Sequence, residues 1–219
     1  MVTRENFQVE LDKIKNMIIN FAKDTEKVLN MSIDALYNQD IELAKQIIID
    51  DRLLDAQDTK INDEAILLIA KQQPVASDLR RLIVALRISS DLERMADNAK
   101  NIAKSTIHLG ESHGLDIHPT IKDMKNIAFK MLDIAVEAYQ NEDIGLSRKL
   151  AEMDDLVDSM YGDVIRAMLK ETATNPEKIQ HIMQMSFCAR YIERFADHST
   201  NIGESILYMV KGENFDLNY

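Results

Sequence analysis

Hydrophobic residues recur every three or four positions along most of the chain, which is the spacing of an amphipathic α-helix. The first segment keeps this spacing at Phe7, Leu11, Ile14, Ile18, Phe21, Thr25, Val28, Ser32 and Ala35. Only six glycines and three prolines interrupt the chain, and helix-forming residues dominate throughout. We therefore predict an all-α fold.

Breaks in the pattern divide the chain into six long predicted helices. Asp40 is expected to cap the second helix, Pro74 to end it, and Asn175 to cap the sixth. The segment 110–119 has two glycines and one proline and is the only substantial break. The predicted helices cover roughly residues 7–38, 40–73, 77–109, 120–140, 143–171 and 176–211.

An internal repeat divides the six helices into two halves. Residues 92–102 align without gaps on residues 192–202, each position 100 residues later, and both copies contain Glu-Arg-x-Ala-Asp. Residues 51–55 are echoed by residues 154–158, 103 residues later. We therefore predict two tandem three-helix bundles, over residues 1–109 and 120–213, joined by a hinge at 110–119.

Acidic residues recur four positions apart at matching places in the two repeats. Residues four apart share one face of a helix, so each pair of like charges destabilises an isolated helix by roughly 0.2–0.5 kcal/mol. A bound cation would offset the repulsion, because hard metal ions prefer carboxylate oxygens. Ion pairs from Arg94 and Arg194 to a neighbouring helix are the alternative explanation. The pairs are Asp51 and Asp55, Glu93 and Asp97, Asp154 and Asp158, and Glu193 and Asp197.

Composition and charge narrow the classes of function. The net charge of −11 would repel a nucleic-acid backbone, so no nucleic-acid partner is expected. The longest purely apolar run, residues 65–70, is too short for direct membrane insertion, and a single cysteine suits a cytoplasmic protein. The chain has neither a nucleophile elbow nor a phosphate-binding loop, so we do not expect an enzyme.

Histidines offer weaker candidates for a site. His108, His113 and His118 lie in or beside the predicted hinge, where solvated histidines are a better explanation than metal ligands. His198 follows Asp197 directly. It is expected either to join the second acidic group or to serve as a polar surface residue.

Three motifs together resemble the PhoU family. They are Gln72-Gln73-Pro74-Val75-Ala76-Ser77-Asp78-Leu79-Arg80-Arg81, then Glu93-Arg94-x-x-Asp97, and finally Glu193-Arg194-x-x-Asp197. The resemblance covers nearly the whole chain. It implies two three-helix bundles side by side, whose eight paired acids hold metal, either a multinuclear iron cluster or Mn, Mg, Zn or Ni. It also implies restraint of phosphate uptake and of the phosphate-starvation response, through the transporter ATPase PstB and the sensor kinase PhoR. A homodimer is expected as well.

The chain departs from the family pattern at two places. Ala96 and Ala196 stand where the family often has glycine, and Thr174-Asn175-Pro176-Glu177 replaces the Gln-Pro-Val-Ala segment in the second repeat. The second departure predicts that the two halves are not functionally equal. Two other classes stay open: a carboxylate-rich metal-storage or di-iron bundle, although no glutamate has histidine three residues later, and a purely structural helical module.

Overall fold

The computed structural model describes residues 2–111, 114 and 116–217. Its six long helices and one short 3₁₀ turn account for most of these residues, so the all-α prediction is confirmed. In chain order they are α1 (Val2–Asn38), α2 (Ile41–Gln72), α3 (Ala76–Leu109), α4 (Thr120–Asn141), α5 (Ile144–Thr174), the 3₁₀ turn η1 (Pro176–Lys178) and α6 (Ile179–Lys211).

Aspartates and αL residues set several of the helix ends. The Asp40 carboxylate accepts a hydrogen bond from the Leu43 amide at 2.9 Å, which confirms it as the cap of α2. Asp143 caps α5 in the same way. At the other end of α2, Gln73 adopts an αL conformation with φ of 47°, immediately before Pro74. These boundaries agree closely with those predicted from the sequence.

The predicted cap of the sixth helix is wrong. The Asn175 side chain donates back to Glu171 Oε1 at 2.8 Å instead of accepting from the amides that follow it. Pro176 then starts the 3₁₀ turn η1, and α6 begins only at Ile179. The proline fixes φ but does not specify whether the next turn is α or 3₁₀, so the sequence signal was ambiguous here.

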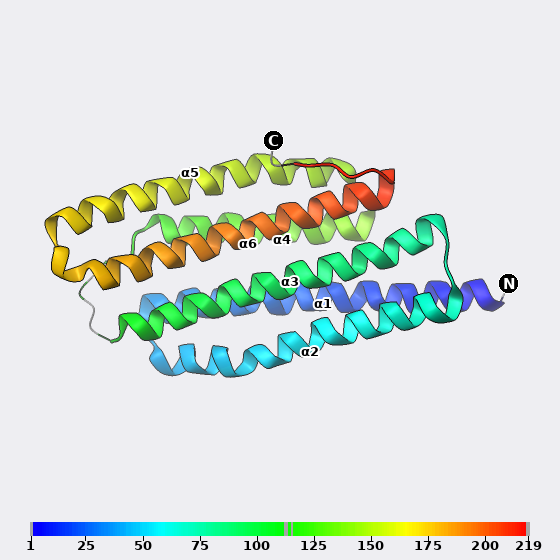
Figure 1. The fold of residues 1–219 in the computed structure, drawn as a ribbon, viewed down its shortest axis with the longest axis horizontal. Helices are drawn as coiled ribbons and strands as arrows, with labels where there is room; N and C mark the ends of the chain where they lie inside the picture. Colours follow the sequence, from blue (N-terminus) through cyan, green and yellow to red (C-terminus); the bar gives the residue numbers. More distant parts are fainter. Residues whose placement is uncertain (1, 112–113, 115, 218–219) are drawn as a thin grey trace.

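The two repeats share one hydrophobic core. Helices α1, α2 and α3 pack on one another, as do α4, α5 and α6, and the most extensive contact between the two groups is α3 against α6. In Figure 1 the two bundles lie side by side, with α3 and α6 in front and α1 and α4 behind them. One continuous cluster of buried side chains includes residues of both repeats, such as Leu92 and Phe195.

A buried polar contact also joins the repeats. His198 of α6, only 9% exposed, lies with Nδ1 3.0 Å from Asp91 Oδ1 of α3. Asn201 Nδ2 donates to the same carboxylate oxygen at 3.4 Å. The prediction that His198 is a polar surface residue is therefore wrong, because its ring pairs with Asp91 in the α3–α6 interface, although its charge also lowers the pKa of Asp197. Among the described residues, no helix is long and apolar enough to cross a membrane.

Close packing of α5 on α6 provides a test of the fold. A Cβ added at Gly203 would lie 2.8 Å from Leu150 Cδ1 and 3.2 Å from the Ser147 carbonyl oxygen. We expect Gly203→Val to lower the free energy of unfolding by about 1–3 kcal/mol through overpacking. A Cβ at Gly162, also in a helix, would meet only the flexible Arg166 side chain. Gly162→Val is the matched control and should change stability by less than about 0.5 kcal/mol in urea titrations. Equal effects of the two substitutions would contradict this packing.

Candidate metal-binding clusters

The eight predicted acids form two groups, one in each repeat. In each repeat the first pair belongs to the middle helix, α2 or α5, and the second pair to the last helix, α3 or α6. Asp51 and Asp154 are buried at matching positions, whereas Asp55 and Asp158 are exposed. The i, i+4 spacing predicted that the members of a pair share a face, and the packing of the last two helices brings the pairs together. We call the groups cluster 1, Asp51, Asp55, Glu93 and Asp97, and cluster 2, Asp154, Asp158, Glu193 and Asp197.

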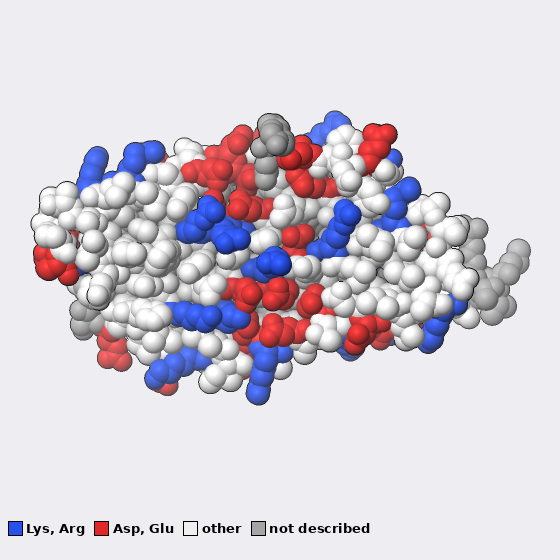
Figure 2. Space-filling view, viewed as in Figure 1, with Lys and Arg blue, Asp and Glu red and all other residues white. Residues whose placement is uncertain are grey.

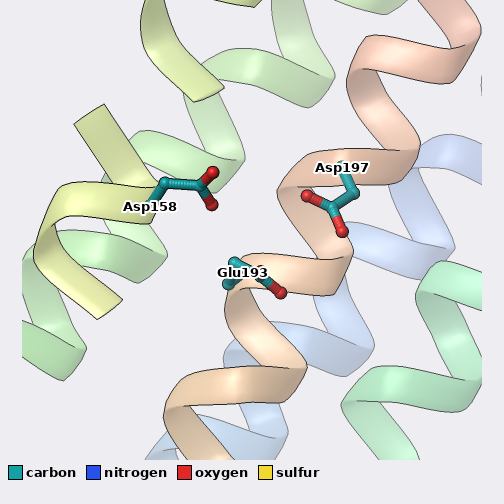
Figure 3. A group of neighbouring side chains, drawn as sticks. All are labelled: Asp158, Glu193 and Asp197. Carbon is teal, nitrogen blue, oxygen red and sulfur yellow. The ribbon is translucent and has the colours of Figure 1, made fainter. Parts of the chain in front are cut away.

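Three acids of cluster 2 approach one another closely. Each of Asp158, Glu193 and Asp197 offers one oxygen, and these oxygens lie within 4.8 Å of one another. Figure 3 shows Asp158 extending from α5 toward α6, where Glu193 and Asp197 stand one turn apart. Among the described residues, this is the one group of three or more His, Cys, Asp or Glu side chains that meets this spacing. Such an array of oxygens suits a hard divalent or trivalent cation.

The carboxylates of cluster 2 are held in an environment that opposes their charge. Burial, together with the negative charges of Asp197 and Asp158, raises the pKa of Asp154 to about 7, although the Thr200 hydroxyl acts in the opposite direction. Burial and the neighbouring Asp197 likewise raise the pKa of Glu193 to about 7, although Arg190 acts in the opposite direction. The pKa of Asp197 is raised as well, by burial and then by Asp158. A cation among these oxygens would favour the ionised forms.

Two carboxylate oxygens of cluster 2 have no partner in the described part of the chain. They are Asp154 Oδ1 and Glu193 Oε2, both buried and without a hydrogen bond. A buried polar atom left unpaired costs free energy, so buried carboxylate oxygens normally have a donor or a metal ion beside them. Asp154 and Glu193 are each only 6% exposed. The residues of cluster 2 therefore fit a bound cation.

Cluster 1 has the same four acids but also contains an ammonium group. Lys100 of α3 donates a hydrogen bond to Asp51 Oδ2 and forms an ion pair with Asp97 Oδ1. Partial burial disfavours the charged lysine, but its bonds to Asp51 and Asp97 outweigh this effect and raise the pKa of Lys100. Burial and the nearby Asp51 raise the pKa of Asp55, whereas Lys100 lowers it. The positive charge in cluster 1 thus comes from the chain itself.

The cations that contact the acids are not the ones considered from the sequence. Arg94 and Arg194 are exposed, and the groups that pair with the carboxylates are Lys100 and Arg190. Both were missed. A signal for each is in the spacing, because Lys100 lies three residues after Asp97 and Arg190 three residues before Glu193. Spacing alone did not single them out, since many other lysines and arginines stand three or four residues from an acid.

The surface charge follows the two clusters. Figure 2 shows acidic side chains gathered in one patch over α5 and α6 and in another over α2 and α3, with basic side chains between them. Of the loop histidines, His108 is exposed near the end of α3, and His118 is half-buried. His113 lies outside the described residues.

The fold and the clusters define a class of protein: a helical chain of two three-helix repeats, with paired acids on the last two helices of each. The sequence matches the PhoU domain twice, over residues 18–106 and 121–206. The chain therefore belongs to the PhoU family, as its motifs predicted.

Individual relatives resemble the chain over almost its whole length. A PhoU homolog from Clostridium acetobutylicum, named as a phosphate-specific transport system accessory protein, is 33% identical over 219 residues, which are 99% of this chain and 100% of the relative. The crystal structure of PhoU from Pseudomonas aeruginosa matches with a TM-score of 0.87 and 29% identity, covering 94% of this chain and 100% of that one. The crystal structure of the phosphate transport system regulatory protein PhoU from Streptococcus pneumoniae matches with a TM-score of 0.89 and 26% sequence identity. The match covers 96% of this chain and 99% of that one.

The raised pKa values predict how stability depends on pH in metal-free protein. In the folded state Asp154 and Glu193 titrate near 7, above their ordinary values of 3.8 and 4.5. Between the ordinary pKa values and about pH 7, the folded state therefore binds more protons than the unfolded state. The free energy of unfolding is then greatest at the acidic side of this range and falls as the pH rises toward 7. Each kcal/mol lost should lower the Tm by roughly 2–4 °C in a chain of this size.

The measurement is a calorimetric scan of chelator-treated protein from about pH 5 to about pH 8. The control is the variant Asp154→Asn/Glu193→Gln, in which the carboxyls can no longer titrate. We expect its Tm to decline less over this range than that of the wild type. Identical profiles for the two proteins would contradict the assigned pKa values.

Proposed function

We propose that this protein regulates phosphate transport and phosphate-starvation signalling, and restrains both when phosphate is plentiful. The observation that carries the proposal is the match to proteins named as accessory or regulatory components of phosphate transport systems, which extends over nearly the full length of each chain. Both repeats and both acidic clusters lie inside the matched length. The proposed partners are the transporter ATPase PstB and the sensor kinase PhoR, with the protein acting in the cytoplasm beside the transporter.

Exposed apolar side chains on the outer helices support a role in binding partners. Leu53 and Ile66 of α2 are 58% and 56% exposed, and the residues 103 positions later, Leu156 and Leu169 of α5, are 49% and 66% exposed. The repeat has therefore placed the same pair of apolar side chains on the surface of each bundle. Leu53 and Leu156 each lie between the two acids of a pair, so the apolar and acidic residues belong to the same helix turns. Apolar groups of this kind are typical anchors in protein interfaces.

Metal at cluster 2 is the second part of the proposal. Asp158, Glu193 and Asp197 would hold the cation, with the buried Asp154 carboxylate beside them. When bound, the cation supplies positive charge between α5 and α6. The carboxylates of the chain then fix the relative position of these two helices, and with it the surface that Leu156 and Leu169 present to a partner.

Deletion of the gene tests the regulatory function. We expect phosphate-starvation genes to be expressed in phosphate-rich medium when the protein is absent, because the restraint on the transporter and kinase is lost. Reporter expression measured in the deletion strain, with and without the wild-type gene supplied on a plasmid, gives the result. Reporter activity that stays repressed in the deletion strain would count against the proposal.

Charge placed on the apolar positions tests partner binding. Leu53→Glu/Leu156→Glu should weaken co-purification of the transporter ATPase by roughly tenfold, since a hot-spot side chain contributes about 1–2 kcal/mol. The control is Ile179→Glu at the start of α6, where the side chain is 46% exposed but lies outside the repeated pair. Equal loss for both variants, or no loss for either, would remove these leucines from the interface.

A further inference from the structure

One difference between the two clusters lies at a position that the internal repeat makes directly comparable. Lys100 and Thr200 occupy the same place in the aligned segments 92–102 and 192–202. Each lies three residues after the second acid of its pair and so on the same side of its helix. The lysine carries a positive charge into cluster 1, whereas the threonine is fully buried and uncharged. Each of the four acids of cluster 1 has the same residue type at its counterpart position in cluster 2.

In cluster 1 the ammonium of Lys100 already contacts the acids of both helices. It bonds to Asp51 of α2 and to Asp97 of α3, so it joins the two helices that a metal ion would join. The Lys100 and Asp51 side chains are only 17% and 10% exposed, so the pair is largely shielded from water. The ammonium is tethered to its own helix and is present at high local concentration, with no need for binding from solution. A metal ion would have to displace it or tolerate a like charge beside it.

In cluster 2 the positive group lies at the edge. Arg190 reaches Glu193 through Oε1, but its side chain is 45% exposed, and Glu193 Oε2 remains without a partner in the described part of the chain. Asp154 Oδ1 is also buried without a hydrogen bond in the described part of the chain, and the neighbouring Thr200 hydroxyl, which lowers the pKa of Asp154, brings no charge to it. Burial of both residues exceeds nine-tenths. The negative charge of cluster 2 is therefore left to be balanced by a cation from solution.

We propose that Lys100 is a built-in substitute for the metal of cluster 1, so that this chain binds divalent metal at cluster 2 alone. The inference rests on the metal part of the proposed function, because it assigns that metal to one cluster and excludes the other. It also gives the two repeats different roles: the acids between α2 and α3 are balanced by the chain itself, whereas the acids between α5 and α6 respond to the supply of metal.

Removal of the lysine tests the assignment. Purified protein is dialysed against Mn²⁺ and its metal content is determined by elemental analysis, with binding followed in parallel by titration calorimetry. We expect Lys100→Thr, which copies the residue of cluster 2, to bind about twice as much Mn²⁺ as the wild type, because the four paired acids of cluster 1 then have no ammonium among them. Lys104→Thr is the matched control: Lys104 is exposed and donates to Asn101 rather than to an acid of cluster 1, so its loss should leave the metal content unchanged.

Variants of the acids separate the two clusters without altering the lysine. In the wild type, Asp158→Asn/Asp197→Asn should abolish binding, and Asp55→Asn/Glu93→Gln should leave it unaffected. Thermal unfolding gives a readout that does not depend on counting ions. Metal-free Lys100→Thr should unfold at a lower temperature than the wild type, and Mn²⁺ should restore most of the difference.

The outcomes separate the inference about Lys100 from the proposal that cluster 2 binds metal. Loss of about half the metal from wild-type protein on Asp55→Asn/Glu93→Gln substitution would overturn the inference and leave the metal part of the proposed function intact. Binding by Lys100→Thr but not by the wild type would refute metal at cluster 2 and support the role of Lys100. A folded Lys100→Thr variant with no additional Mn²⁺ would overturn the inference, whatever the wild type binds.

Discussion

The contact between α3 and α6 is the constraint on which the rest of the structure depends. It is the most extensive contact between the two repeats, and both helices contribute small buried residues to the common core, among them Ala96 and Ala196. Because α2 packs on α3 and α5 packs on α6, this contact also fixes the outer helices. Both acidic clusters, and the exposed leucines beside them, take their positions from it.

The four acids of each cluster repel one another, so each cluster requires a balancing positive charge or bound protons. Packing two helices together brings four carboxylates into a partly dehydrated space, where their mutual repulsion is stronger than on an isolated helix. A positive charge must lie among them, or protons must bind. The chain answers this requirement in cluster 1 with Lys100. In cluster 2, burial and the neighbouring carboxylates raise the pKa of Asp154 and Glu193, so that protons offset part of the repulsion when no cation is bound.

Much of the fold was predictable because it depends on local rules. Asp40 before an apolar-periodic run, and Pro74 after it, set helix ends through interactions within a few residues, and both agree with the structure. Asn175 and His198 were assigned wrongly for the opposite reason. Asn175 had two neighbouring partners to choose between, and His198 pairs with Asp91, which lies 107 residues earlier in the chain. Such a partner has no signature in local spacing.

By itself, the sequence determined the helices, the duplication and the eight acids, because these follow from periodicity and from comparing one half of the chain with the other. The tertiary structure alone decided which acids meet, since that depends on how α5 packs on α6. It also decided that Lys100 enters its cluster, whereas Arg94 and Arg194 remain exposed. The physical reason is that a charged side chain near an acid in the sequence has many partners within reach, and only the packing of a second helix selects one of them.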